Sequence, residues 1–421
     1  MTPSTADTQD PNAHHLAAIV QAKRALRAAM PDLKQRFAAL TAHIEEQVQA
    51  IEAERAAGIS PVPTVDAADL DTLDSAALDR VRQRGCVVVR GVFDPSRVQA
   101  WNAELADYLD RNRYLEKEVS KRGIDKYFSS LASGRPQIFG IYWSRPQMDA
   151  RQSPELARVR RWLNRLWTFE HAGKQVFNPD LECTYADRVR QRQPGDKTLG
   201  LSPHTDGGSI ERWIDPGYQQ VYRHVFGGDL RQYNAFDAAF RTKTQEIPSP
   251  AVCRMFRTFQ GWTALTAQGP GDGTLRVAPM ADAMAWVLLR ALQDDVPEDS
   301  LCGARAGRAL GVNAEFHSLI LRAYGPIPKV EQGDTVWWHP DVIHGVEDEH
   351  LGSGSSNVMY IGAAPDCEKN RLFQALQKPA FEAGLSSPDF APENYEVDFS
   401  GRATPADLSP LGLRQMGFAS G

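Results

Sequence analysis

The sequence predicts an α+β fold in which a barrel or sandwich of short β-strands forms the core and helices surround it. Residues 86–89, 335–338 and 358–361 are short β-prone segments, and glycine- or proline-containing turns separate such segments along the chain. The chain contains neither a GxGxxG nor a GxxxxGKS/T motif, so a nucleotide-binding βαβ sheet is not indicated. A long amphipathic stretch near the N-terminus predicts a helical extension to this core.

Composition limits the kind of partner that we expect. The 421 residues carry a formal net charge of -6, which provides no general attraction to nucleic acid or to an anionic membrane. The five cysteines lie far apart and form no CxxC pair, so free thiols in a reducing compartment are predicted. There is no signal peptide in residues 1–15 and no apolar run of membrane-spanning length. We therefore expect a cytoplasmic protein with a small-molecule substrate, which could form a homo-oligomer.

The sequence predicts that the chain is divided into three segments. Residues 1–13 are polar and are predicted to be disordered, residues 14–65 form a helical extension with a linker, and residues 66–421 form the β-barrel domain with helical insertions and a C-terminal extension. Apolar side chains recur at steps of three and four from Leu33 to Ile51, and Pro31 is expected to break the helix. We expect this helix to pack on its own domain; a partner-binding or dimerising helix is the alternative.

Three further segments bear on the site. Residues 251–265 are predicted to be extended, with Cys253, Met255, Arg257 and Phe259 on one face. Residues 315–324 are predicted to form a strand. Residues 188–197 are basic and are predicted to be a solvated charged loop, with an anion-binding loop at the mouth of the site as the alternative.

One pair of residues suggests a metal site. His204 and Asp206 stand two residues apart, so in extended backbone both side chains point to the same face, and Gly207 and Gly208 allow a bend just after them. Chance alone accounts for about one such His-x-Asp pair in a chain of this composition. A second pair, His339-Pro-Asp341, does occur, but it is not followed by a histidine distant enough to return on another strand. His344 lies several strands beyond the first pair.

Several motifs around this pair resemble a known enzyme group. The chain has His-x-Asp-Gly-Gly, the segment Gly-x-Leu-x-Val-x-Pro at residues 273–279, and a Gly-Asp pair eleven residues ahead of His344-Gly345. Together they resemble the non-haem iron(II), 2-oxoglutarate-dependent dioxygenases, most closely the phytanoyl-CoA-dioxygenase-like branch. Residues 85–95, 140–144, 256–262 and 344–350 look more narrowly like the YbiU proteins, a family assigned to this fold. The resemblance, which covers roughly residues 70–410, implies a double-stranded β-helix, that is, a jelly-roll or cupin-like barrel.

The resemblance also implies a metal, a cosubstrate and a reaction. It assigns His204, Asp206 and His344 as ligands of Fe(II), with 2-oxoglutarate and dioxygen taking the remaining positions. The implied reaction is hydroxylation of a small organic substrate, with succinate and carbon dioxide as by-products. A purely structural alternative is that His344 caps a turn and Asp206 accepts hydrogen bonds from backbone amides.

The chain departs from the family pattern at the position that clamps 2-oxoglutarate. An arginine or lysine usually follows the distal histidine by about ten to fifteen residues, but residues 354–360 contain no cation. Arg257 is the first candidate for this clamp because it is placed on an apolar face, and an internal salt bridge is the alternative. Arg276 is the second candidate, although its inward-facing neighbours would turn it outward.

The last predictions concern aromatic residues of the substrate pocket and two functions that are alternatives to a dioxygenase. Tyr142, Trp213 and Trp262 are candidates for the substrate pocket, with a plain core role as the alternative. His339 is expected to have a surface or packing role, and support of the metal ligands is the alternative. A metal-binding barrel that senses or binds a small carboxylate is one alternative to the dioxygenase. A zinc-dependent hydrolase is another, with Glu211 as the nearby base.

Overall fold

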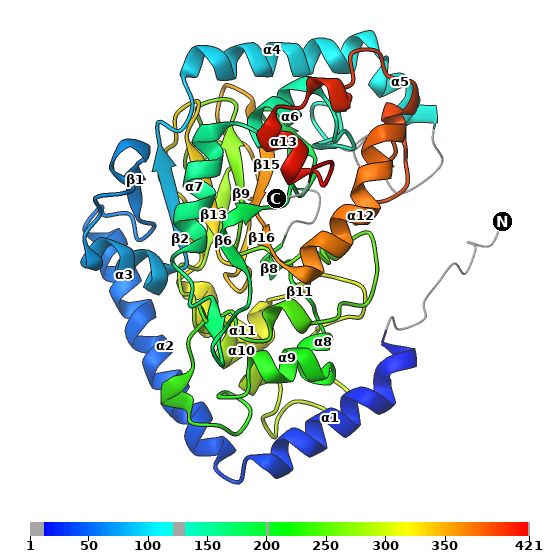
Figure 1. The fold of residues 1–421 in the computed structure, drawn as a ribbon. Helices are drawn as coiled ribbons and strands as arrows, with labels where there is room; N and C mark the ends of the chain where they lie inside the picture. Colours follow the sequence, from blue (N-terminus) through cyan, green and yellow to red (C-terminus); the bar gives the residue numbers. More distant parts are fainter. Residues whose placement is uncertain (1–11, 121–130, 199–201, 420–421) are drawn as a thin grey trace, which may run out of the picture.

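Two β-sheets form the centre of a mixed α+β fold in the computed structural model, which describes residues 12–120, 131–198 and 202–419 (Figure 1). The larger sheet has the strand order β1 (Thr64–Asp66), β2 (Cys86–Arg90), β13 (Thr335–Trp338), β9 (Phe259–Ala264), β15 (Ser356–Ala363), β7 (Val189–Arg192) and β3 (Ile138–Phe139). The smaller sheet has the order β11 (Leu310–Gly311), β8 (His204–Thr205), β14 (His344–Val346), β10 (Leu275–Val277) and β12 (Gly325–Pro326). All strand pairs in both sheets are antiparallel except β1 with β2.

The central strands of the larger sheet are apolar on both faces. Val336 and Trp338 of β13 join a buried cluster with Leu275 and Val277 of the smaller sheet, so this face lies against that sheet. Trp337 points to the opposite face, because successive side chains of a strand alternate, and joins a second buried cluster. Helices α4 (Pro95–Arg111) and α7 (Pro154–Asn164) supply much of that second cluster. The larger sheet is therefore covered on both faces.

A third buried cluster joins the N-terminal helices to the lower half of the molecule in Figure 1. Helices α1 (Leu16–Ala29) and α2 (Leu33–Ala56) meet at Pro31, as the sequence predicts, and Leu40, Ile44, Val48 and Ile51 of α2 are buried. These side chains pack with α8 (Glu211–Ile214), α9 (Pro216–Val221), α10 (Ala283–Arg290) and α11 (Ala314–Arg322). The helical prediction for this stretch is confirmed, and its apolar face packs on this chain. The division between residues 65 and 66 stays a prediction.

The remaining elements frame the core. They are the helices α3 (Ser75–Arg84), α5 (Tyr114–Ser120), α6 (Arg145–Arg151), α12 (Glu368–Ala383) and α13 (Pro410–Gln415), and the strand pairs β6 (Asn178–Glu182) with β16 (Pro365–Asp366) and β4 (Glu170–His171) with β5 (Lys174–Gln175). All five cysteines are free. Every helix in the described ranges is too short or too polar to traverse a lipid bilayer. The stretch predicted to be disordered, 1–13, lies outside the described residues except for its last two.

The structure corrects two secondary-structure predictions. Residues 315–324 were expected to form a strand, but α11 occupies Ala314–Arg322, because the Asn313 side chain caps its first turn by accepting from the Phe316 amide. The extended segment predicted from residue 251 becomes a strand only at Phe259. Met255 and Phe259 belong to different buried clusters, so the four residues predicted to share one face do not all share it.

The structure confirms the predicted α+β class but does not show the predicted closed barrel. Neither of the two central sheets closes on itself through the described strands, and the architecture is a mixed α+β fold with several sheets. The double-stranded β-helix therefore stays a prediction at this point.

The second His-x-Asp pair has a structural role. His339 is fully buried, stacks on Trp167 with ring centroids 4.7 Å apart, and accepts a hydrogen bond at Nδ1 from the Asp341 amide. The Asp341 carboxylate accepts from Arg212 at 2.7 Å and from Arg241 at 2.8 Å. Burial raises the pKa of Asp341, but the two guanidinium groups outweigh burial and hold this pKa well below its usual range. Of the two roles predicted together for His339, surface and packing, its burial fits packing.

Replacing Asp341 should therefore destabilise the fold. Asp341→Asn removes the negative charge that two buried guanidinium groups share, and we expect the free energy of unfolding to fall by about 3–5 kcal/mol. Chemical denaturation at pH 7 measures this change. Asp294→Asn is the control, because Asp294 pairs with Lys34 at an exposed position and its loss should leave the midpoint unchanged. Equal stability of the two variants would contradict the structural role of Asp341.

Candidate metal centre

The antiparallel pairing of β8 with β14 brings two histidines together. His204 and His344 are direct partners in the register of these strands, and Val277 of β10 lies opposite His344 on its other side. The centroids of the two imidazole rings lie 4.5 Å apart. The pairing of β8 with β14, two strands far apart in the sequence, therefore places two imidazole nitrogen donors side by side.

Asp206 reaches the same point because the chain bends immediately after β8. Gly208 has a φ of +63°, and a Cβ atom at this residue would lie 2.5 Å from the Tyr218 hydroxyl oxygen. Only glycine fits such a backbone beside such a neighbour. The bend turns the chain into α8, while the Asp206 side chain stays with the two histidines.

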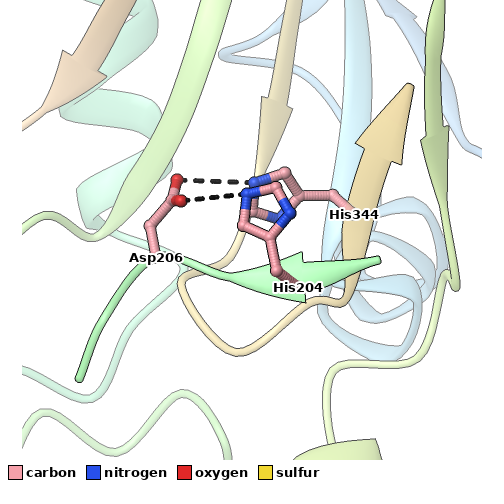
Figure 2. Close-up of side chains that lie close together, drawn as sticks. All are labelled: His204, Asp206 and His344. Atoms are coloured by element: carbon pink, nitrogen blue, oxygen red, sulfur yellow. Dashed lines mark ion pairs between the residues drawn. The ribbon is translucent and has the colours of Figure 1, made fainter. Parts of the chain in front are cut away.

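Both imidazoles are oriented by backbone carbonyls. The Nδ1 atom of His204 lies 2.6 Å from the Ser202 oxygen, and that of His344 lies 3.0 Å from the Val342 oxygen. A hydrogen bond donated from Nδ1 to a carbonyl leaves Nε2 without a proton in the neutral ring. Both Nε2 atoms face the Asp206 carboxylate, at 3.2 Å from His204 and 3.4 Å from His344 (Figure 2).

These three side chains have the composition and spacing of a metal site. One ligand atom from each residue can be chosen so that all three lie within 4.8 Å of one another. Two ligand atoms in adjacent positions on a first-row metal lie roughly 3 Å apart when each bond is about 2.1 Å long. The nitrogen–oxygen distances match that spacing, and two imidazoles with one carboxylate form the donor set of a facial triad. The residues present therefore fit a divalent metal ion.

The protonation of the two histidines differs. Burial lowers the pKa of His344, and burial together with the neighbouring His204 outweighs the raising effect of Asp206. Burial also lowers the pKa of His204, but the hydrogen bond and charge of Asp206 outweigh burial and raise it. The pKa of Asp206 is raised by burial, but the two histidines hold it well below its usual range. Asp206 is therefore a carboxylate near neutral pH, and His204 is the ligand for which protons compete most.

The three residues open into a cavity between the two sheets. Both central sheets contribute to its walls, and apolar and aromatic side chains form much of the lining. This part of the lining comprises Trp262, Trp338, Leu275, Val346, Val358, Ile361, Val252, Ile138 and Phe390. Burial raises the pKa of Cys253, another lining residue, to about 12, so its thiol stays protonated near neutral pH.

Arg257 lines this cavity without a partner. It is 7% exposed, makes no hydrogen bond or ion pair with another described residue, and lies over the Tyr185 ring at 4.8 Å. Burial lowers the pKa of Arg257, but neighbouring groups, which include the carboxyl of Asp206, outweigh burial and raise it. Gln260 belongs to the same lining, and its buried Nε2 amide has no hydrogen-bond partner in the part of the chain that the structure describes. Two donors thus face the cavity, and the internal salt bridge considered for Arg257 does not form among the described residues.

The structure places the other candidate residues as follows. Trp262 lines the cavity. Tyr142 packs against Trp143 and Phe390 in a buried cluster outside the lining, and Trp213 donates to the Leu288 carbonyl within the helical cluster. Arg276 points away from the cavity and lies over the Tyr324 ring at 4.5 Å, which agrees with the outward direction of its position on β10. The geometry therefore favours Arg257 over Arg276 and Trp262 over the other two aromatic residues.

Sequence reasoning missed several lining residues. Arg188 and Arg190 line the cavity, although the basic stretch was expected to be a solvated loop, and Arg190 lies on β7 with only 3% of its surface exposed. Tyr360 of β15 also lines the cavity. The alternation of arginine with other residues at 188, 190 and 192 was the signal that could have identified a strand with one basic face.

The fold and the three side chains define a candidate metal-binding protein with a mixed α+β core. A family model described as Gig2-like matches residues 14–418, so the chain belongs to the Gig2-like family. The uncharacterized protein YbiU of Escherichia coli K12 is 47% identical over 409 residues, which cover 96% of this chain and 97% of that protein. The predicted likeness to the YbiU proteins is confirmed.

Solved structures agree with this assignment. A structure from Salmonella typhimurium LT2, described provisionally as an oxidoreductase, has a TM-score of 0.90 and 44% identity, covering 99% of this chain and 100% of that chain. The structure of GlcNAc Inducible Gene 2 from Candida albicans has a TM-score of 0.79 and 27% identity, covering 95% of this chain and 88% of that chain. The chain therefore shares its fold along nearly its whole length with bacterial and fungal relatives.

Removing either histidine should abolish tight metal binding. We expect His204→Ala and His344→Ala each to lower the affinity for Co(II) or Fe(II) by more than about 100-fold, since loss of an outer partner alone costs about 10–100-fold. Anaerobic calorimetric titration of the metal-free protein measures the affinity. His171→Ala, at an exposed position on β4, is the matched control. Wild-type affinity in both ligand variants would exclude this site.

Metal affinity should also depend on pH in a defined direction. A proton on Nε2 competes with the metal, and the raised pKa of His204 extends that competition upward from the ordinary histidine range. We expect the affinity for Co(II) to rise with pH from about 6 to 8, with a slope approaching one proton released per metal bound. Titrations in buffers of different ionisation enthalpy count the protons. An affinity that is constant across this range would contradict the protonation of His204.

Proposed function

We propose that this protein is a non-haem iron(II), 2-oxoglutarate-dependent dioxygenase that hydroxylates a small organic substrate. The observation that carries the proposal is the group His204, Asp206 and His344, which projects into a cavity that Arg257 also lines. The Arg257 guanidinium has no ion pair or hydrogen bond with another described residue. A three-ligand metal face and a separated cation suit a molecule that has an oxo-acid group at one end and a carboxylate at the other.

The chain's own residues would hold the reactants in defined places. When bound, Fe(II) and 2-oxoglutarate supply the oxidation, in which one oxygen atom of dioxygen enters succinate, carbon dioxide is released, and the other oxygen atom enters a C–H bond of the substrate. The two Nδ1 hydrogen bonds to carbonyls fix the histidine rings so that their Nε2 atoms face the metal position. The aromatic lining around Trp262 and Trp338 excludes water from the reacting groups.

Arg257 is the proposed clamp for the far carboxylate of 2-oxoglutarate. Its side chain passes Gly362 of β15, where a Cβ atom would lie 3.2 Å from the arginine Cδ, so the absence of a side chain at Gly362 makes room for it. The unpaired Gln260 amide is a second donor for the same carboxylate. A clamp from the segment leading into β9 would replace the missing cation after His344.

The two-sheet core supports a double-stranded β-helix as the underlying fold. The smaller sheet carries His204 and His344, Asp206 follows β8 directly, and the larger sheet supplies the opposite wall of the cavity. The relative from Salmonella described provisionally as an oxidoreductase is consistent with this chemistry.

The geometry does not favour the hydrolase. Glu211, the base considered for a zinc-bound water, is 2% exposed, and its carboxylate accepts from the amides of Ser209 and Ile247. Besides Asp206, the carboxylates among the described lining residues are Asp187, paired with Arg188, and Asp389, held by Arg254 and Tyr185. None of these groups is a free base.

Anaerobic titration with 2-oxoglutarate tests the proposal. The Fe(II) protein should develop a weak visible charge-transfer band on addition of 2-oxoglutarate, and air should then produce succinate without added substrate. Arg257→Gln should weaken 2-oxoglutarate binding by about tenfold or more, because a carboxylate loses a charged double hydrogen bond. Arg276→Gln is the matched control, since it removes an arginine outside the cavity.

The remaining outcomes separate the alternatives. Absence of both the band and succinate, with zinc bound tightly, would overturn the dioxygenase proposal. Binding of 2-oxoglutarate without turnover would indicate a metal-dependent carboxylate sensor. An unchanged affinity in Arg257→Gln would remove Arg257 from the clamp role.

A further inference from the structure

The inner face of β7 carries a row of arginines. Arg188, Arg190 and Arg192 alternate along the chain, while Val189 between them belongs to the buried cluster on the opposite face of the sheet. Arg192 is satisfied within the protein, because its guanidinium donates to the carbonyls of Asp196, Gly273 and Glu347. It therefore has a structural role.

Arg190 lacks such partners. It is 3% exposed, its Nε has no hydrogen-bond partner, and its one hydrogen bond to a described residue is a long one of 3.4 Å from Nη2 to the Gly273 carbonyl. Burial lowers the pKa of Arg190. By contrast, the pKa of Arg241 is raised despite burial, because Asp341 lies beside it. A buried guanidinium without an anion or several carbonyls is costly, so the site calls for a ligand.

A comparison of all buried arginines in the described part of the chain isolates two of them. There are eight: Arg84, Arg151, Arg160, Arg190, Arg192, Arg212, Arg241 and Arg257. Six have a carboxylate partner or at least two hydrogen bonds to carbonyls. The other two, Arg190 and Arg257, have neither, and both line the cavity that contains the metal ligands.

The surroundings of Arg190 fit an organic anion with an apolar body. Arg188, the residue just before β7, lies over the Phe390 ring at 4.3 Å. Among the described residues its side chain uses only Nε, for Asp187, which leaves its terminal nitrogens for a ligand. Val358 of β15 is the register partner of Arg190, and Trp262 of β9 lies on the next strand in the same cavity.

We infer that the substrate of this site is a small organic acid whose anionic group, a carboxylate or a phosphate ester, is held by Arg190 and Arg188. Its apolar part lies along Val358, Trp262 and Phe390. The inference rests on the proposed function in one respect, namely that the anion is the substrate of the metal site. If 2-oxoglutarate occupies the metal and Arg257, the β7 arginines are left for a second anion.

Three small probes test the anion site. Benzoate, inorganic phosphate and the neutral benzamide are titrated calorimetrically into the Fe(II) protein saturated anaerobically with 2-oxoglutarate. We expect benzoate or phosphate to bind, which distinguishes a carboxylate from a phosphate ester, and benzamide to bind at least about tenfold more weakly than the preferred anion. Failure of both anions to bind, or equal binding of benzamide, would overturn the inference.

Variants of Arg190 locate the site. Arg190→Gln should weaken binding of the preferred anion by about tenfold or more, and the charge-transfer band of the same variant is recorded to show whether 2-oxoglutarate binding is lost as well. Arg190→Lys keeps the charge without the planar guanidinium and should recover part of the affinity. Arg276→Gln is the control, and melting temperatures show that each variant is folded.

The remaining outcomes distinguish this inference from the proposed function. Unchanged anion affinity in Arg190→Gln would overturn the assignment of Arg190. Loss of the charge-transfer band in Arg190→Gln, with the band intact in Arg257→Gln, would show that 2-oxoglutarate binds to the β7 arginines. That result would also overturn the assignment of Arg190 to a substrate anion. If the wild-type protein gives neither band nor succinate, the dioxygenase proposal fails, and the same titrations without 2-oxoglutarate still decide whether Arg190 binds an anion.

Discussion

The pairing of β8 with β14 is the constraint on which the site depends. Each strand is only two or three residues long, but the direct opposition of His204 and His344 fixes the distance between the two rings. A slip of one residue would turn one imidazole to the opposite face of the sheet, since side chains alternate along a strand. β10 and β11 flank the pair and hold this register. The backbone register of the sheet therefore sets the positions of the two histidines, and side-chain rotation has little freedom to change the distance between them.

The sequence could predict that His204, Asp206 and His344 lie together, because their grouping depends on simple geometry. The His-x-Asp spacing, the later β-prone segments and the period of the apolar residues in α2 can all be read from the sequence alone. Residues 315–324 were assigned wrongly because an apolar run such as Leu319-Ile320-Leu321 is compatible with either a strand or a helix. The Asn313 cap and the tertiary packing of α11 decided between them.

The cavity lining was harder to predict, for a different reason. Whether Arg190 meets water or an enclosed cavity depends on which sheet face β7 presents to β14 and β10, and a basic stretch alone does not contain that information. The same limit applies to the aromatic candidates. Tyr142, Trp213 and Trp262 are all buried, and only tertiary structure distinguishes the one that lines the cavity from the two that pack elsewhere. Arg257 was chosen for its apolar neighbourhood, although the local strand invoked for that choice begins after it.

The interior charges explain how one cavity could hold two different anions. Asp206 and the two histidines form one pole, where the carboxylate with a divalent cation would leave a net positive charge. Arg257 passes Gly362 of β15, whereas Arg190 lies on β7, the neighbouring strand, so the two guanidinium groups enter the cavity from different strands. Unpaired buried cations weaken the fold, and natural proteins retain such costs mainly where function needs them. An anion that neutralised either arginine would stabilise the folded state through its own binding. The ligands would then supply the negative charge that the described residues do not place beside Arg190 and Arg257.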